Sequence, residues 1–312
     1  VFAPLESLVS ADAVLASNSS PIEPARIFAG LRDRRRALVL HYFFPAERNP
    51  VVEIVSGPDT SATLVDDLLG FYEAIGKVPV RVGGRYGYAV NPVFEGLFLA
   101  AALCVEEGLG TVKEVDVAAR RALGLGIGPF TAMNLTGGNP ITDHALDEMT
   151  TRVGPWFRSP QLMKDAMASG RPWDVARRDE PVALPTEREE PIADAMMGAY
   201  FGLVGEILDS GIISLGDLEL AVEMGLAVRA PFAFMDALGV ERALALVQAY
   251  AAGHPGFAVP TALARQARGG RPFDITYVLR RDVGDIAVLT IRRPQVLNAL
   301  NDEVYRQLQD RF

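Results

Sequence analysis

The sequence has almost no cysteine, because Cys104 is the only one in 312 residues. A single thiol excludes an internal disulfide framework and any metal site built from several thiolates. Cys104 itself lies in an apolar helical pattern, which indicates a packing position. We therefore expect no metal centre, and we expect a protein of a reducing compartment, the cytoplasm.

Positive charge is also scarce, since 30 Lys and Arg stand against 39 Asp and Glu and the net charge is -9. This balance argues against a nucleic-acid-binding surface. No stretch reaches the roughly 18 uncharged apolar residues of a membrane span. We expect a soluble protein whose partners include neither nucleic acid nor membrane.

The first residue is Val1 rather than methionine, and the opening residues do not have the pattern of a signal peptide. The chain opens with VFAPLESLVS, the pattern of a helix already under way, and it stops at Phe312 inside another helical pattern. We expect both ends to be cut, so that these residues are the middle section of a larger protein. Their number predicts two or three domains.

Short apolar runs alternate with turn residues up to about residue 87, which predicts an α/β unit. The strand candidates are 13–17, 37–40, 51–55 and 78–82, and residues 61–75 have one apolar helical face. The pattern after residue 91 is helical, and it repeats. Residues 93–134 and 192–236 share a helix, a glycine turn, a second helix and a Pro-Phe segment, which predicts two tandem helical domains.

A charged, proline-bearing linker is predicted over residues 177–191, between the two helical domains. Trp156 and Trp173 lie near its start, and we interpret them as packing residues. From Tyr277 the pattern changes to a β-hairpin, followed by a helix from Asn298. We expect a new domain to begin there.

The two central strand candidates each bring one ionisable residue, His41 and Glu53, to the same part of the sheet. Pro45 and Pro50 interrupt the loop between them, so the chain re-enters the sheet nearby and sets Glu53 beside the imidazole. A buried carboxylate fixes the tautomer of a histidine and stabilises the imidazolium. The pattern predicts a general base for a substrate hydroxyl. The alternative is a histidine bonded to a backbone carbonyl and a glutamate on a solvated strand edge.

Polar residues after the first strand candidate, Asn18 and Ser20 among them, suit a ligand crevice at the carboxyl ends of strands. An ordinary turn before Pro21 explains them equally well. Asn91 precedes Pro92 and an apolar helical run, so the sequence alone favours a helix N-cap over an amide that contacts substrate.

Five segments in order, ASNSS (16–20), LHYFFP (40–45), VVEIV (51–55), YAVN (88–91) and GIGPF (126–130), together resemble the 3-hydroxyacyl-CoA dehydrogenase family. The resemblance covers about residues 1–270. It implies an NAD-dependent enzyme with His41 and Glu53 as the catalytic pair. It also implies that Ser20 and Asn91 contact the acyl-CoA substrate and that Asn18 lies near the nicotinamide.

One family feature is missing, because no G-x-G-x-x-G follows a strand candidate. Gly124, Gly126 and Gly128 lack the spacing and are interpreted as turn and packing glycines. Residues 1–87 are therefore expected to be the C-terminal part of a Rossmann NAD-binding domain whose phosphate-binding half precedes Val1. Phe44, in place of the usual Asn before the loop proline, is a further departure that bears on acyl-chain preference.

The segment VGDIAVLTIRRPQVLNALN resembles the opening of an enoyl-CoA hydratase (crotonase) domain. The predicted domains are thus 1–87, two helical copies at 88–184 and 185–273, and a crotonase start at 274–312. The resemblance implies a bifunctional β-oxidation enzyme that oxidises (S)-3-hydroxyacyl-CoA. We expect such an enzyme to assemble either as a homodimer or as an internal pseudo-dimer of its helical domains. The alternatives are a dehydrogenase of small hydroxy acids without CoA and a non-catalytic structural descendant.

Overall fold

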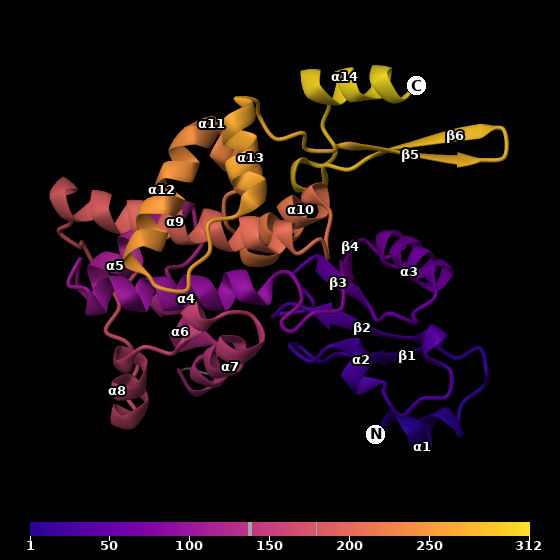
Figure 1. Ribbon diagram of the computed structural model, residues 1–312, viewed down its shortest axis with the longest axis horizontal. Helices are drawn as coiled ribbons and strands as arrows, with labels where there is room; N and C mark the ends of the chain where they lie inside the picture. The colour runs from indigo at the N-terminus through magenta and orange to yellow at the C-terminus, as the bar shows by residue number, and fades with distance from the viewer. Residues whose placement is uncertain (137–138, 179) are drawn as a thin grey trace.

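The computed structural model describes residues 1–136, 139–178 and 180–312 and consists of an α/β unit, a larger helical part and a C-terminal hairpin (Figure 1). The α/β unit ends at residue 83. Its elements are α1 (Phe2–Glu6), β1 (Leu15–Ser17), α2 (Pro24–Ile27), η1 (Arg34–Arg36), β2 (Ala37–Tyr42), β3 (Val51–Ser56), α3 (Ala62–Ala74) and β4 (Val78–Gly83). All four predicted strands are present, although the first begins at Leu15 and not at residue 13.

The strands form one sheet in the order β1-β2-β3-β4. β1 pairs parallel with β2, β2 pairs antiparallel with β3, and β3 pairs parallel with β4. The apolar runs of β2 and β3 are buried because both faces of the sheet are covered. On one face Val65 and Tyr72 of α3 pack against Leu38 and Ile54, and the other face continues into the helical core.

The helical part contains two successive segments of five α-helices each, among the described residues. The first comprises α4 (Asn91–Glu106), α5 (Val112–Leu123), α6 (Pro129–Leu135), α7 (Asn139–Arg152), η2 (Pro155–Phe157) and α8 (Gln161–Ser169). The second comprises α9 (Thr186–Asp209), α10 (Leu215–Leu226), α11 (Pro231–Leu238), α12 (Val240–Gly253) and α13 (Thr261–Gly269). Trp156 and Trp173 are buried at the end of the first segment, as predicted.

The same helix-capping interactions recur in both helical segments. Thr111 and Ser214 are N-caps whose side chains accept the N–H three residues on, and they begin α5 and α10. The next helix in each segment is capped by a buried carboxylate, which satisfies N–H groups that a helix start leaves unpaired. The pairs are Asp116 with the N–H groups of Phe130 and Thr131, and Glu219 with those of Phe232 and Ala233.

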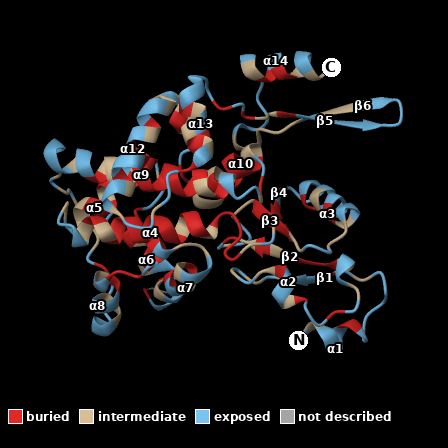
Figure 2. Cartoon of the chain, viewed as in Figure 1, coloured by how far each residue is buried: buried red, intermediate tan, exposed pale blue. Residues whose placement is uncertain are grey.

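Helix α9 joins the two helical segments, because it packs against α4 and α5 of the first and against α12 of the second. By length and composition this helix could cross a membrane, but 61% of its most apolar window is buried inside the protein. Figure 2 shows buried residues concentrated in α4, α9 and the sheet. Packing in the core therefore accounts for the apolar character of α9.

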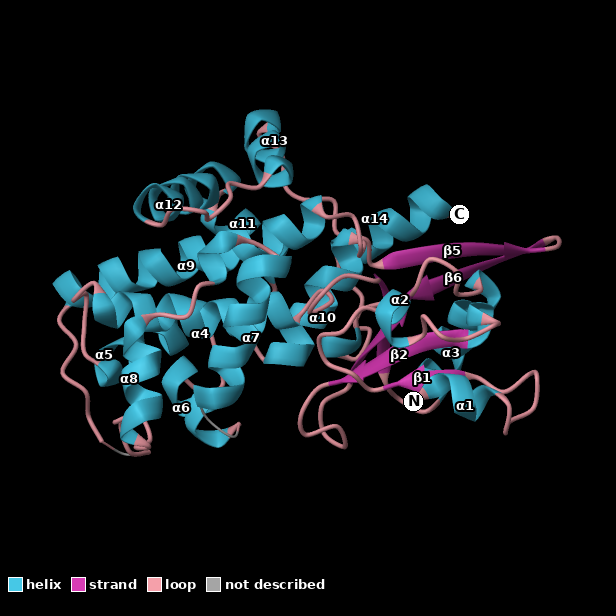
Figure 3. Ribbon diagram, turned by 60° about the horizontal axis from the view of Figure 1, so that its bottom comes forward, coloured by secondary structure: helices cyan, strands magenta, loops and turns pink. Residues whose placement is uncertain are grey.

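Helix α10 contacts the sheet, so the second helical segment also touches the α/β unit (Figure 3). The side-chain amide of Asn49, in the β2–β3 loop, donates to the carbonyl of Gly225 at 2.8 Å. The N–H of Gly83 donates to the carbonyl of Ile212 at 2.7 Å. The first bond holds the loop that follows β2 against the helical part, and the second holds the end of β4 there.

The C-terminal residues form the predicted hairpin, β5 (Val278–Val283) and β6 (Ile286–Ile291), which projects from the rest of the chain (Figure 1). It is followed by η3 (Pro294–Val296) and α14 (Asp302–Arg311). The prediction that the last helix starts at Asn298 is wrong. Asn298 has a φ of 57°, and the N-cap is Asn301, whose side chain accepts the N–H of Val304.

The predicted linker over residues 177–191 is too long at its C-terminal end. Helix α9 begins at Thr186, with Glu187 and Glu189 in its first turn, where negative charge interacts favourably with the helix dipole. Residue 179 of this linker lies outside the described residues. Gly128 is the packing glycine that was predicted, because a Cβ there would lie 2.2 Å from the carboxyl carbon of Asp116.

Candidate active site

His41 and Glu53 face each other directly across β2 and β3. The antiparallel register pairs the two residues, and Nδ1 of His41 lies 2.6 Å from Oε2 of Glu53. Their side chains are 4% and 0% exposed. The alternative of a glutamate on a solvated strand edge is therefore wrong. The prediction that His41 and Glu53 lie side by side is confirmed.

The second oxygen of Glu53 determines which ring nitrogen of His41 carries the proton. Oε1 accepts the backbone N–H groups of Ala89, at 3.0 Å, and Val90, at 3.2 Å. In both bonds the carboxylate oxygen is the acceptor. An ionised Oε2 can only accept, so Nδ1 of His41 donates to it and the lone pair remains on Nε2. The sequence did not single out these two backbone amides.

Nε2 of His41 has no hydrogen-bond partner among the residues that the structure describes. This nitrogen is not fully enclosed by the protein either, so it keeps access to solvent. The rings of Phe43 and Tyr88 pack edge-on against the imidazole, at centroid distances of 4.8 and 5.3 Å. The arrangement is that of an oriented general base with one open nitrogen.

Tyr88 links this pair to the loop after β1, although the sequence pattern does not single it out as a site residue. Its φ is 53°, a conformation that few residues other than glycine adopt. Its buried hydroxyl lies 2.9 Å from the carbonyl oxygen of Ser19 and 2.7 Å from that of Ile22. Burial raises the pKa of this phenol, which keeps the hydroxyl a donor. The only sequence signal was its place in the segment YAVN.

Changing Tyr88 to phenylalanine is expected to loosen the Ser19–Ile22 loop without disturbing the His41–Glu53 bond. The substitution removes the hydroxyl that both carbonyls face, and the loss of one such hydrogen bond typically costs about 0.5–1.5 kcal/mol of stability. We expect a lower urea midpoint and a raised KM, with a kcat that changes less than KM. Tyr305→Phe on exposed α14 is the control. A kcat that falls while KM stays constant would contradict a positioning role.

Asn91 is not the N-cap of α4, contrary to the expectation from sequence alone. Val90 is the N-cap, and Asn91 is the first residue of the helix, with Pro92 second. The Asn91 side chain instead donates from Nδ2 to the carbonyl of Ser20, at 3.0 Å. This bond brings the two predicted substrate-contacting residues together, and it leaves the hydroxyl of Ser20 and Oδ1 of Asn91 without a protein partner among the described residues.

Asn18 lies just past the carboxyl end of β1, next to the strand that carries His41. Its side chain is exposed and makes no hydrogen bond to a described residue, whereas neighbouring Ser17 accepts the N–H of Ser19. An unused amide and the open Nε2 of His41 on adjacent strands fit a polar planar group such as nicotinamide. The contact of Asn18 with the nicotinamide stays a prediction.

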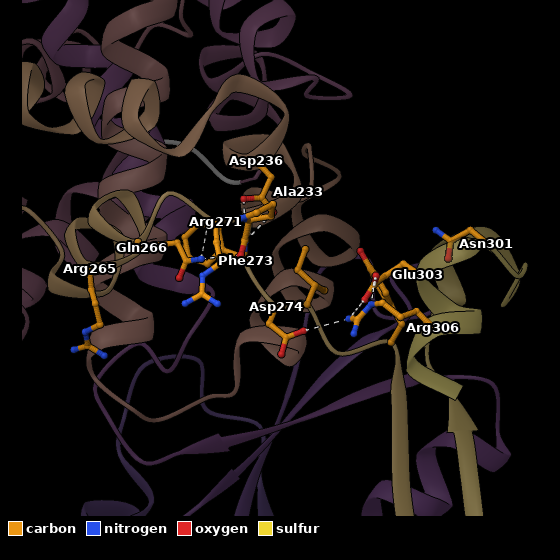
Figure 4. Close-up of a pocket in the computed structure, with 14 residues that line it drawn as sticks. Ala233, Asp236, Arg265, Gln266, Arg271, Phe273, Asp274, Asn301, Glu303 and Arg306 are labelled. Carbon is orange, nitrogen blue, oxygen red and sulfur yellow. Dashed lines mark hydrogen bonds and ion pairs between the residues drawn. The ribbon is translucent and has the colours of Figure 1, made fainter. Parts of the chain in front are cut away.

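A cleft of about 990 Å³ lies elsewhere, between α11, α13 and α14 (Figure 4). None of the predicted site residues lines it. Its polar groups are largely bonded to one another: Asp236 accepts the N–H of Phe273, Gln266 donates to the carbonyl of Arg271, and Arg306 pairs with Glu303. The cleft does not present a set of unpaired catalytic groups.

Comparison with known families agrees with this geometry. Residues 1–85 match the model for the NAD binding domain of 3-hydroxyacyl-CoA dehydrogenase. Residues 87–174 match the model for the C-terminal domain of 3-hydroxyacyl-CoA dehydrogenase. The chain belongs to the 3-hydroxyacyl-CoA dehydrogenase family. The match confirms the prediction of NAD as cofactor, and it places His41, Glu53 and the loop after β1 in the NAD-binding domain of the family.

Curated relatives match only part of the chain. L-carnitine dehydrogenase of Burkholderia mallei is 32% identical over 152 residues, which are 47% of this chain and 47% of that protein. A peroxisomal fatty acid beta-oxidation multifunctional protein of Arabidopsis thaliana is 29% identical over 266 residues, 73% of this chain and 35% of the relative. The chain thus spans about half or less of these relatives.

The fold resembles 3-hydroxybutyryl-CoA dehydrogenase from Escherichia coli, with a TM-score of 0.74. The identity is 18%, and the match covers 86% of this chain and 78% of that one. The likeness in fold therefore extends past residue 174 into the second helical segment. The domain matches stop before that segment and include no crotonase domain in this chain.

Proposed function

We propose that this member of the 3-hydroxyacyl-CoA dehydrogenase family belongs to an enzyme that oxidises (S)-3-hydroxyacyl-CoA to 3-ketoacyl-CoA with NAD. The observation that supports this most directly is the His41–Glu53 pair. Nδ1 is bonded to a buried carboxylate and Nε2 is open. Oxidation of a secondary alcohol requires a group that removes the hydroxyl proton, and an imidazole held in this tautomer is suited to it.

His41 Nε2 takes the proton of the 3-hydroxyl group, and Glu53 stabilises the imidazolium that results. Bound NAD would supply the acceptor for the hydride that leaves C3. The hydroxyl of Ser20 and the amide oxygen or nitrogen of Asn91 hydrogen-bond the substrate, and Asn18 contacts the nicotinamide end. Ser20 and Asn91 suit this role because the bond between them fixes their relative position at the edge of the site.

A hydratase on the same polypeptide is the finer part of the proposal. Residues 278–312 form a hairpin and a helix, an arrangement that supports this proposal. Leu297 at 94%, Ile286 at 66% and Tyr305 at 54% leave apolar surface exposed there. A multifunctional β-oxidation protein is also among the relatives. We propose that these residues begin a hydratase domain that covers this surface.

The two helical segments are proposed to be tandem copies that form an internal pseudo-dimer. The shared order of elements, the paired caps and the packing of α9 on α4 and α5 support this. In such an arrangement the second segment occupies the place of a partner subunit.

A second candidate substrate is a small hydroxy acid without CoA. The similarity to L-carnitine dehydrogenase over 152 residues favours it. The same general base serves both substrates, so His41 and Glu53 do not separate them. The difference between the two candidates lies in the groups that contact the rest of the substrate.

The test is the oxidation of NADH by the full-length protein, with acetoacetyl-CoA and free acetoacetate as alternative substrates. Turnover of the thioester supports the proposal. Turnover of only the free acid supports the second candidate. An absence of both, from a folded protein that binds NADH, would indicate a non-catalytic descendant and would overturn the proposal.

A further inference from the structure

Glu95, in the second turn of α4, has a buried carboxyl that the proposed mechanism does not use. The residue is 9% exposed, and Oε2 is fully enclosed with no hydrogen-bond partner among the described residues. No described basic side chain forms an ion pair with it, and the hydroxyl of Thr142 on α7 is the polar group beside it. Burial raises the pKa of this carboxyl to about 8. A buried carboxyl oxygen without a hydrogen-bond partner opposes folding, so Oε2 calls for a functional explanation.

The fold itself does not require a carboxyl at this position, as the second helical segment demonstrates. Helices α4 and α9 end at the C-caps Glu107 and Ser210. Glu95 and Gly198 each lie 12 residues before the C-cap of their helix, so they occupy equivalent positions in the two segments. In the second segment the helices close tightly, since a Cβ on Gly198 would lie 2.7 Å from the carbonyl oxygen of Leu246 on α12. The first segment keeps α4 and α7 far enough apart to hold a glutamate.

Glu95 is also close to the proposed substrate contacts. It follows Asn91 by four residues, so both lie on the same face of α4, about one helical turn apart. Helical side chains lean toward the N-terminus, which inclines the Glu95 carboxyl toward the turn that contains Asn91. Asn91 in turn holds the Ser20 carbonyl. Glu95 therefore lies about one helical turn from Asn91, near the end of α4 at which the substrate is expected.

We propose that Glu95 is a specificity-determining residue that accepts a positively charged group, an ammonium or quaternary ammonium, carried by the acyl part of the substrate. This inference rests on the proposed function of the same site. A cation is the partner that the carboxyl lacks. An uncharged acyl chain would leave Oε2 unpaired in the complex, whereas a cation would form a desolvated ion pair with it.

The test compares two CoA thioesters that differ only in charge. One carries 3-hydroxy-4-(trimethylammonio)butanoate and the other its carbon isostere, 3-hydroxy-5,5-dimethylhexanoate. Their dissociation constants are measured by isothermal titration calorimetry, without cofactor, on the full-length protein and on Glu95→Gln and Glu95→Met. Glu219→Gln is the matched control, because Glu219 is a buried carboxyl on α10 that is bonded to two backbone N–H groups.

The wild type is expected to bind the charged thioester at least about tenfold more tightly than its isostere, and both Glu95 variants are expected to lose this preference. Binding at pH 7 should release close to one proton in the wild type, because the carboxyl ionises beside the cation. Glu219→Gln should keep the preference. Equal affinities in the wild type, or a preference that survives in Glu95→Met, would overturn the proposal. Turnover of 3-hydroxybutyryl-CoA by the wild type tests the dehydrogenase assignment separately.

Discussion

Replacing His41 by alanine is expected to lower kcat by about 10²- to 10⁴-fold, because a positioned general base contributes that much to proton transfer. No described side chain forms a hydrogen bond with Nε2 of His41, so no neighbouring group is placed to accept the proton in its stead. The measurement is steady-state kinetics of the full-length protein with 3-hydroxybutyryl-CoA and NAD. NADH binding, followed by fluorescence, should remain close to that of the wild type.

His144 on α7 provides a matched control for His41→Ala. It is one of the three histidines of the chain, and its side chain is exposed. His144→Ala should leave kcat and KM unchanged. If His41→Ala retains more than a tenth of the wild-type kcat, His41 is not the base, and the proposed chemistry is wrong.

Glu53→Gln is expected to have the second-largest effect on turnover, with little change in the fold. The amide oxygen of glutamine can still accept the N–H groups of Ala89 and Val90, so its NH2 group then faces Nδ1 of His41. That orientation favours the tautomer with the proton on Nε2, which cannot act as a base. We expect kcat to fall by about 10²-fold or more, as in other enzymes in which a carboxylate orients the catalytic histidine.

The tautomer change can be observed directly by ¹⁵N NMR of the His41 ring, independently of turnover. Glu47→Gln is the control, because Glu47 is exposed in the same β2–β3 loop. Glu53→Ala is a harsher variant, since it leaves two buried N–H groups and Nδ1 unpaired. It should unfold at a lower urea concentration than Glu53→Gln. An unchanged kcat in Glu53→Gln would show that the carboxylate does not orient the base.

The parts of the site that could be predicted from sequence are those that local pattern determines. Continuous apolar runs identified β2 and β3, and the proline-interrupted loop between them implied that His41 and Glu53 meet. The turn glycines and the hairpin at residues 278–291 likewise follow from local preference. In each case the residues that determine the conformation lie within a few positions of one another.

The features that sequence missed depend on groups distant in the chain. Asn91 has the composition of an N-cap, but the carbonyl of Ser20, 71 residues away, binds its amide instead. The positive φ of Tyr88 is maintained by its hydroxyl contacts with the loop after β1 and by complete burial. The contact of the Asn49 side chain with Gly225 joins residues 176 positions apart. No local pattern contains these partners.

The hydrogen bonds from the N–H groups of Ala89 and Val90 to Glu53 connect the sheet to the helical part. These two residues immediately precede α4, so the carboxylate that orients His41 is anchored by the first turn of the helical part rather than by the sheet alone. A rigid-body displacement of the helices away from the sheet would pull both N–H groups from Oε1 and release the tautomer of the imidazole. His41 therefore has the tautomer of a general base only while the helical part is packed against the sheet. The rate of proton transfer thus depends on the contact between the two parts.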